Sequence, residues 1–190
     1  TPALWAQLEK DDITLREACG NAVRNITASE TAGIDINEPF DVSPYADATF
    51  KFFLRNPICQ EMGRKFKMSF SGTDDDTAIS FIHDLGFIAK IKTENGVAQK
   101  GFKVLLGGGL GSQPRHADVI YDFLEEDVLI PTIEGVLRIF DRFGERSKRA
   151  KARLKFLVKD IGVTAFLELV AAEIHTLEYQ TFKVDTTTFE

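Results

Sequence analysis

Apolar and polar residues alternate within the run 64–72, strictly so from Lys65 to Ser71. The apolar positions are Phe66, Met68 and Phe70, and the polar positions between them are Lys65, Lys67 and Ser69. A period of two is typical of a strand with one buried face, so we expect the apolar set to face a core. The two lysines then project from the opposite face, about 6–7 Å apart. Such a pair could bind a small anion, or it could be solvated on a half-exposed strand.

Two later apolar runs, 86–92 and 101–106, indicate strands, and the turn signal Glu94-Asn95-Gly96 between them predicts an antiparallel hairpin. Helical spacing and flanking signals predict helices over 2–9, 45–54, 131–143, 147–160 and 163–176. Residues 29–44 are rich in turn-forming residues and predict a loop. We therefore expect one α+β domain over residues 1–190. Its sheet should be mixed and mostly antiparallel, with helices from the C-terminal half covering one face.

Composition narrows the function classes. The chain has 190 residues, 44% of them hydrophobic, with 16 Phe, so a sizeable core is expected. Its net charge of −6 argues against nucleic-acid binding by the whole chain. Cys19 and Cys59 are too few and too far apart to form a metal site, and free thiols suit a reducing compartment. No apolar run has membrane length, so we expect a cytoplasmic protein that binds no membrane.

Three other features bear on chemistry, and each has two interpretations. Arg24 could be an ordinary surface residue or a planar donor aimed at a carboxylate or an oxyanion. The glycine-rich stretch 107–111 lacks the spacing of a dinucleotide fingerprint, but it would let backbone approach a bulky cofactor. The run 142–159 holds eight basic residues and one acidic residue. It could be a solvated helix face or a nucleic-acid-binding helix.

Taken together, four segments resemble the sirohaem-dependent sulfite and nitrite reductases in order and spacing. These segments are 19–28, which contains Arg24, 63–67 with the two lysines, the glycine stretch 101–111, and the basic run 149–159. The resemblance covers nearly the whole chain. That family joins sirohaem to a 4Fe-4S cluster through a shared cysteine thiolate and reduces sulfite or nitrite by six electrons.

The resemblance also implies residue roles. By resemblance, the substrate-facing residues are Arg24, Lys65 and Lys67. The partners of sirohaem carboxylates are Arg64 and Arg149, and the backbone nearest the macrocycle is that of Gly107, Gly108 and Gly109. Elementary chemistry agrees, because a polycarboxylate needs Arg and Lys donors, and an oxyanion that loses oxygen as water needs positive charge and protons. We therefore expect Arg24, Lys65, Lys67 and Arg149 to cluster on one concave, positively charged surface. A lysine at position 67 is similar to the sulfite reductases of the family, whereas the similar ferredoxin-type nitrite reductases tend to have Asn at this position.

The chain also departs from the family pattern. Asn21 stands where Asp is usual, Ser29-Glu30 where Cys-Pro is common, and Met62-Gly63 where Leu-Pro is common. The four cluster cysteines are absent, and residues 186–190 indicate a strand that the chain does not complete. We expect the first cofactor-binding domain of a longer reductase, without a metal site, inactive alone and binding neither cluster nor sirohaem by itself. Its partners would be sulfite or nitrite, the rest of the polypeptide, and ferredoxin or a reductase partner as electron donor. A non-catalytic scaffold domain of a degenerate reductase remains the alternative.

Overall fold

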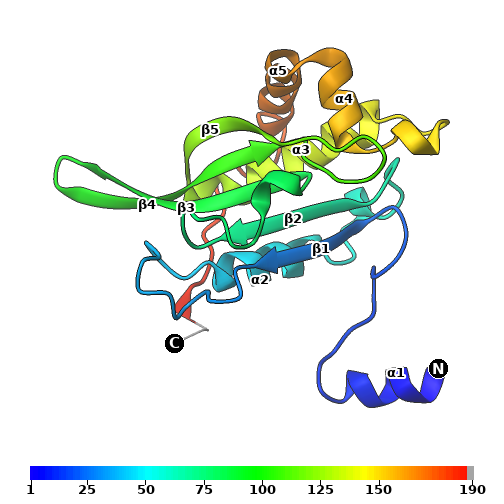
Figure 1. The fold of residues 1–190 in the computed structure, drawn as a ribbon, viewed down its shortest axis with the longest axis horizontal. Helices are drawn as coiled ribbons and strands as arrows, with labels where there is room; N and C mark the ends of the chain where they lie inside the picture. Colours follow the sequence, from blue (N-terminus) through cyan, green and yellow to red (C-terminus); the bar gives the residue numbers. More distant parts are fainter. Residues whose placement is uncertain (188–190) are drawn as a thin grey trace.

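A five-stranded mixed sheet organises the computed structural model, which describes residues 1–187 (Figure 1). The strands follow chain order across the sheet: β1 Val23–Ala28, β2 Phe66–Ser71, β3 Leu85–Glu94, β4 Val97–Leu106 and β5 Asp118–Glu125. β1 and β3 both run parallel to β2, whereas β4 runs antiparallel to its neighbours β3 and β5. The mixed sheet and the α+β class are confirmed. The two edge strands, β1 and β5, were not predicted.

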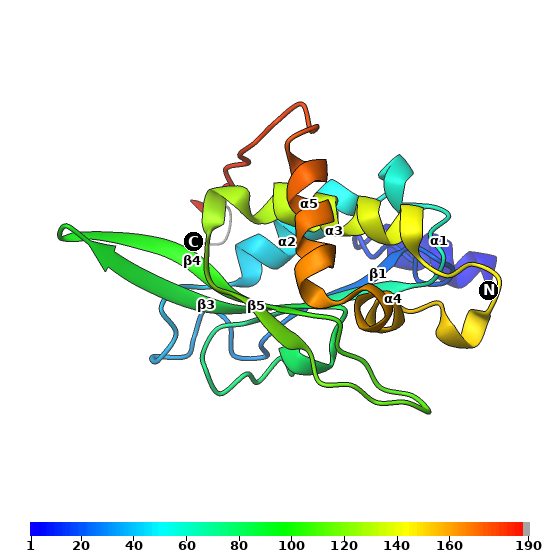
Figure 2. The same ribbon diagram turned by 90° about the horizontal axis from the view of Figure 1, so that it is seen from above.

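Three helices cover one face of the sheet (Figure 2): α2 Ser43–Phe53, α3 Leu129–Phe143 and α5 Val163–Ile174. The alternation in β2 explains this arrangement, because Phe66, Met68 and Phe70 are fully buried in the core shared with these helices. The predicted helices 45–54, 131–143 and 163–176 match these three within two residues at each end. Phe102 of β4 packs edge-on against Phe70 and thereby joins two strands of the core.

The opposite face of the sheet is covered by loops. Ser69 was expected to project outwards beside the lysines, but it is fully buried under the short 3-10 helix η2, Ser80–Ile82. Its hydroxyl donates to the Ser80 hydroxyl at 3.1 Å, so the buried polar group is satisfied. Within β2 only Lys67 keeps partial access to solvent, as does Lys65 directly before the strand.

The predicted hairpin is present and extends beyond the body of the domain (Figure 2). Strands β3 and β4 pair continuously from Leu85–Leu106 to Glu94–Val97. Asn95 and Gly96 both have positive φ, 51° and 79°, as a two-residue turn of this kind requires. The hairpin tip, residues 91–98, is exposed.

The N-terminal helix α1, Pro2–Glu9, forms as predicted but buries none of its residues. It stands apart from the sheet in Figure 1, and Trp5 is 53% exposed. No helix within residues 1–187 combines the length and apolarity needed to cross a membrane.

The single helix predicted over 147–160 is wrong. The chain forms a 3-10 turn, η4 Arg149–Lys151, and then the shorter helix α4 Leu154–Ile161. Arg153 lies between them with extended backbone, ψ 152°. Its guanidinium binds the buried carboxylate of Asp84. This charge-assisted contact stabilises the extended conformation at Arg153 more than continuation of the helix would. The strand predicted over 186–190 is likewise absent at 186, and residues 188–190 lie outside the described residues.

Candidate functional site

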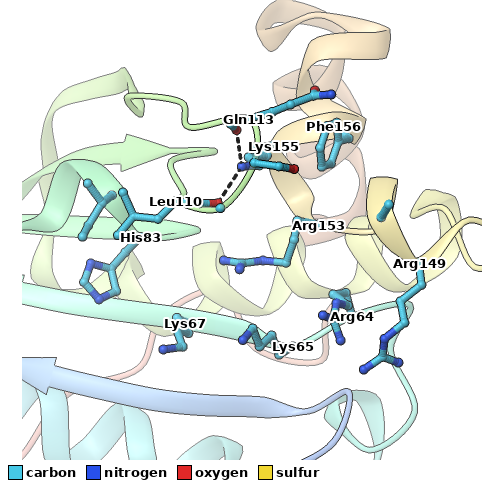
Figure 3. A pocket seen from close by; sticks show the side chains of 14 residues that line it. Arg64, Lys65, Lys67, His83, Leu110, Gln113, Arg149, Arg153, Lys155 and Phe156 are labelled. Carbon is cyan, nitrogen blue, oxygen red and sulfur yellow. Dashed lines mark hydrogen bonds between the residues drawn. The ribbon is translucent and has the colours of Figure 1, made fainter.

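A cavity of about 410 Å³ opens where three segments meet (Figure 3). The segment that leads into β2 contributes Arg64 and Lys65, and β2 itself contributes Lys67. The loop after β4 forms a second wall with residues 110–113, and the η4–α4 segment forms a third. The helices on the opposite face support β2 from behind, so its lysines are presented from a rigid strand.

Six cationic side chains line this cavity, and most of them lack an anionic partner. They are Arg64, Lys65, Lys67, Arg149, Arg153 and Lys155. Within residues 1–187, only Arg153 among them forms an ion pair. Lys155 is almost fully buried, and its Nζ donates to the carbonyls of Leu110 and Gln113 at 3.0 and 2.5 Å, which fixes the loop wall (Figure 3). The remaining four cations are available to an anion.

Electrostatics reflects this excess of positive charge. Burial lowers the pKa of Lys65, and the neighbouring charges of Arg153, Arg24, Lys67 and Arg64 lower it further. Burial and the neighbouring positive charges also lower the pKa of Arg64. A bound anion would relieve both effects, because it screens like charges and supplies hydrogen-bond acceptors.

Asp84 and Arg153 were missed by the sequence analysis. Asp84 is fully buried and accepts from Arg153 through both carboxylate oxygens, at 3.2 Å from Nε and 2.6 Å from Nη2. Burial raises the pKa of this carboxyl, while Arg153 and the Lys67 N–H oppose the rise. The available signal was an acidic residue, Asp84, directly before the apolar run 85–89, together with the excess of basic residues in the run 142–159.

His83 is a second cavity residue that was missed. Its Nδ1 lies 3.0 Å from the Ile79 carbonyl oxygen, which favours the tautomer that carries a proton on Nδ1. Burial lowers the pKa of this imidazole, so the neutral form prevails at neutral pH. Its Nε2 is then free to accept a proton or a hydrogen bond.

Arg24 does not line the cavity, contrary to the expected clustering. It sits at an irregularity of β1 between Val23 and Asn25, and its Nη2 donates to the Ala18 carbonyl at 2.7 Å. The side chain borders a separate small cavity beside Phe50 of α2. Its Nε is buried without a partner among the described residues. The structure therefore brings together Lys65, Lys67, Arg64 and Arg149, while Arg24 contributes only its charge.

The glycines of the stretch lie behind the cavity wall, not on its surface. Gly107, Gly108 and Gly109 are all buried. A Cβ on Gly108 would come 2.4 Å from the Phe81 carbonyl oxygen, and Gly107 has φ +78°. These positions need glycine because the chain packs against itself here.

No group of three or more potential metal ligands from His, Cys, Asp or Glu occurs within residues 1–187. Cys19 is exposed, whereas burial raises the pKa of Cys59 to about 12 and keeps it a thiol. An α+β domain with an open cationic cavity is suited to binding an anion that carries several negative charges or acceptor oxygens.

Residues 19–176 match the nitrite and sulphite reductase 4Fe-4S domain, and the chain belongs to this family. It is 35% identical over 172 residues to a sulfite reductase [ferredoxin] 1 of Mycolicibacterium paratuberculosis, covering 90% of this chain and 30% of that protein. It is 33% identical over 181 residues to the assimilatory ferredoxin-dependent nitrite reductase of Haloferax mediterranei, covering 94% of this chain and 31% of that protein.

The solved structure of the NirA protein of Mycobacterium tuberculosis superposes with a TM-score of 0.83 at 28% identity. That match covers 97% of this chain and 33% of the NirA chain. The resemblance seen in the sequence is thus confirmed at the level of family and fold. The chain spans about a third of the length of these relatives.

Proposed function

We propose that this chain is the sirohaem- and substrate-binding domain of a sulfite reductase. The observation that carries the proposal is the convergence of Arg64, Lys65, Lys67 and Arg149 on one cavity without an acidic partner in the described chain. Holding unpaired cations together costs stability, and a polyanionic ligand offsets that cost.

The donor set fits a macrocycle that carries many carboxylates. Arg64 and Arg149, at one end of the cavity, would bind carboxylates through their planar forks. When bound, sirohaem together with its iron–sulfur cluster would supply electrons to the substrate. The cluster cysteines would come from the rest of the polypeptide, and ferredoxin or a reductase partner would be the electron donor.

Lys65 and Lys67 would bind the oxyanion and deliver protons. Reduction of sulfite to sulfide consumes protons as oxygen leaves as water, so donors must lie next to the substrate. The lowered pKa of Lys65 makes its ammonium a better acid than an exposed lysine. His83, in the same cavity, could return protons from solvent through Nε2.

Lys67 favours sulfite over nitrite as the substrate. Sulfite has three oxygens and a dianionic form, whereas nitrite is a smaller monoanion. A second ammonium beside Lys65 adds charge and a proton donor, whereas an amide at this position would add neither. The relatives include enzymes named for each substrate, so similarity alone does not choose between them.

The test is Lys67→Asn in the full-length reductase, measured by steady-state kinetics with both anions. Loss of a charge-assisted contact in the site should reduce sulfite turnover by about 10²-fold, and nitrite turnover by less. Lys90→Asn is the matched control, because Lys90 lies in β3 and pairs with Asp74. Equal losses on both anions, or a wild-type enzyme that strongly prefers nitrite, would contradict the assignment to sulfite.

A further inference from the structure

We infer that Asp84 is the positioning residue of the cationic cavity: its buried carboxylate holds Arg153 and the Lys67 backbone in the geometry that binds an anion. The inference rests on the proposed function, because it concerns the same cavity. Asp84 is fully buried and does not line the cavity, so it acts through other residues.

Asp84 contacts two of the walls and the glycine segment behind the third. Its carboxylate accepts from Arg153, between η4 and α4, and from the Lys67 N–H in β2 at 2.9 Å. Its own N–H donates to the Lys67 carbonyl at 3.1 Å, and its carbonyl accepts from the Gly107 N–H at 2.9 Å. One residue therefore sets the relative positions of strand β2, the loop after β4 and the start of α4.

The contact with Arg153 also counters repulsion. Arg153 lies among the cavity cations in Figure 3, and its charge contributes to lowering the pKa of both Lys65 and Arg64. Its side chain is only 18% exposed, so solvent screens this repulsion incompletely. The two contacts from Asp84 hold the guanidinium in place against the repulsion.

Charge and position predict opposite effects on anion binding. As a charge alone, Asp84 opposes an incoming anion, so its neutralisation would strengthen binding. As a positioning residue, it keeps the donors convergent, so its neutralisation weakens binding although the cavity becomes more positive. The sign of the change therefore separates the two roles.

The experiment titrates the full chain with citrate at low ionic strength by calorimetry. Asp84→Asn should weaken citrate binding at least tenfold, with loss of the slowly exchanging Arg153 Nε–H signal in NMR spectra that otherwise stay dispersed. Asp74→Asn is the matched control: it makes the same charge change at an exposed carboxylate paired with Lys90, and it should bind citrate like the wild type.

Arg153→Lys provides a second route if Asp84→Asn does not fold. Lysine keeps the charge but cannot bind both carboxylate oxygens as a fork, so citrate binding should again fall at least tenfold. Unchanged or tighter binding in the folded variant tested would overturn the positioning role. A wild-type chain that does not bind citrate would contradict the anion cavity itself, and therefore the proposed function as well.

Discussion

Replacing Lys65 with Met should stabilise the isolated chain, although it removes a charge from the surface. The folded state disfavours the Lys65 ammonium, because burial and four neighbouring cations lower its pKa. Methionine keeps an unbranched apolar stem of similar length, so the packing of the lysine methylenes is largely retained.

The size of the effect follows from the spacing of β2. Lys67 is two residues away on the same face, about 7 Å along the strand, where two unit charges repel by about 0.6 kcal/mol at the dielectric constant of water and about 2.4 kcal/mol at an effective value of 20. Lys65 is partly exposed, so the lower part of this range applies. A gain of about 1 kcal/mol in the free energy of unfolding raises Tm by about 2–4 °C in a chain of this size.

Thermal unfolding at low ionic strength, followed by circular dichroism, measures this gain. Lys51→Met is the control, because Lys51 is 69% exposed and pairs with Asp47 one helical turn away at 2.6 Å. Its replacement should lower the stability by about 0.3–0.5 kcal/mol. In 1 M salt the gain from Lys65→Met should shrink, since screening then acts over about 3 Å.

The pH dependence gives an independent check. The folded-state pKa of Lys65 lies below its unfolded value, so the unfolded chain binds more protons in the window between the two. The wild-type stability should therefore rise relative to Lys65→Met as pH increases through that window. A variant that melts below the wild type, or a gain that is unchanged in high salt, would refute the electrostatic explanation.

Three further predictions concern the fold and the cofactors. Gly108→Ala should destabilise the chain by about 1–3 kcal/mol in chemical denaturation, because a new Cβ would meet the backbone at Phe81. Gly109→Ala should cost less, because its Cβ meets only the flexible Lys155 side chain, and equal costs would contradict this packing. Phe102→Ala should cost about 3–5 kcal/mol, because the ring is fully buried among four aromatic neighbours, and a loss below 1 kcal/mol would be inconsistent with that core. The purified isolated chain should hold no iron–sulfur cluster and little or no sirohaem, since Cys19 and Cys59 cannot supply four thiolates. Stoichiometric iron and sulfide, or a strong haem-type absorption band, would contradict this prediction.

Local patterns determined the elements whose periodicity is regular. Strict alternation placed Phe66, Met68 and Phe70 in the core, and the Asn95-Gly96 pair fixed the hairpin, because each depends only on residues close in the chain. The family was likewise evident in the sequence, since its four segments keep their order and spacing. The sequence also placed Lys65 and Lys67 on the face that the structure opens to the cavity.

Tertiary structure decided the edge strands, the interruption before α4 and the placement of Arg24. Irregular pairing in β1 and beside β5 disturbs the alternation by which a strand is identified. Arg153 leaves the helical path to reach Asp84, 69 residues earlier in the chain, and Arg24 turns towards the Ala18 carbonyl. No local pattern encodes such contacts, because a buried carboxylate selects its partner from whichever donors the completed fold brings within hydrogen-bonding distance.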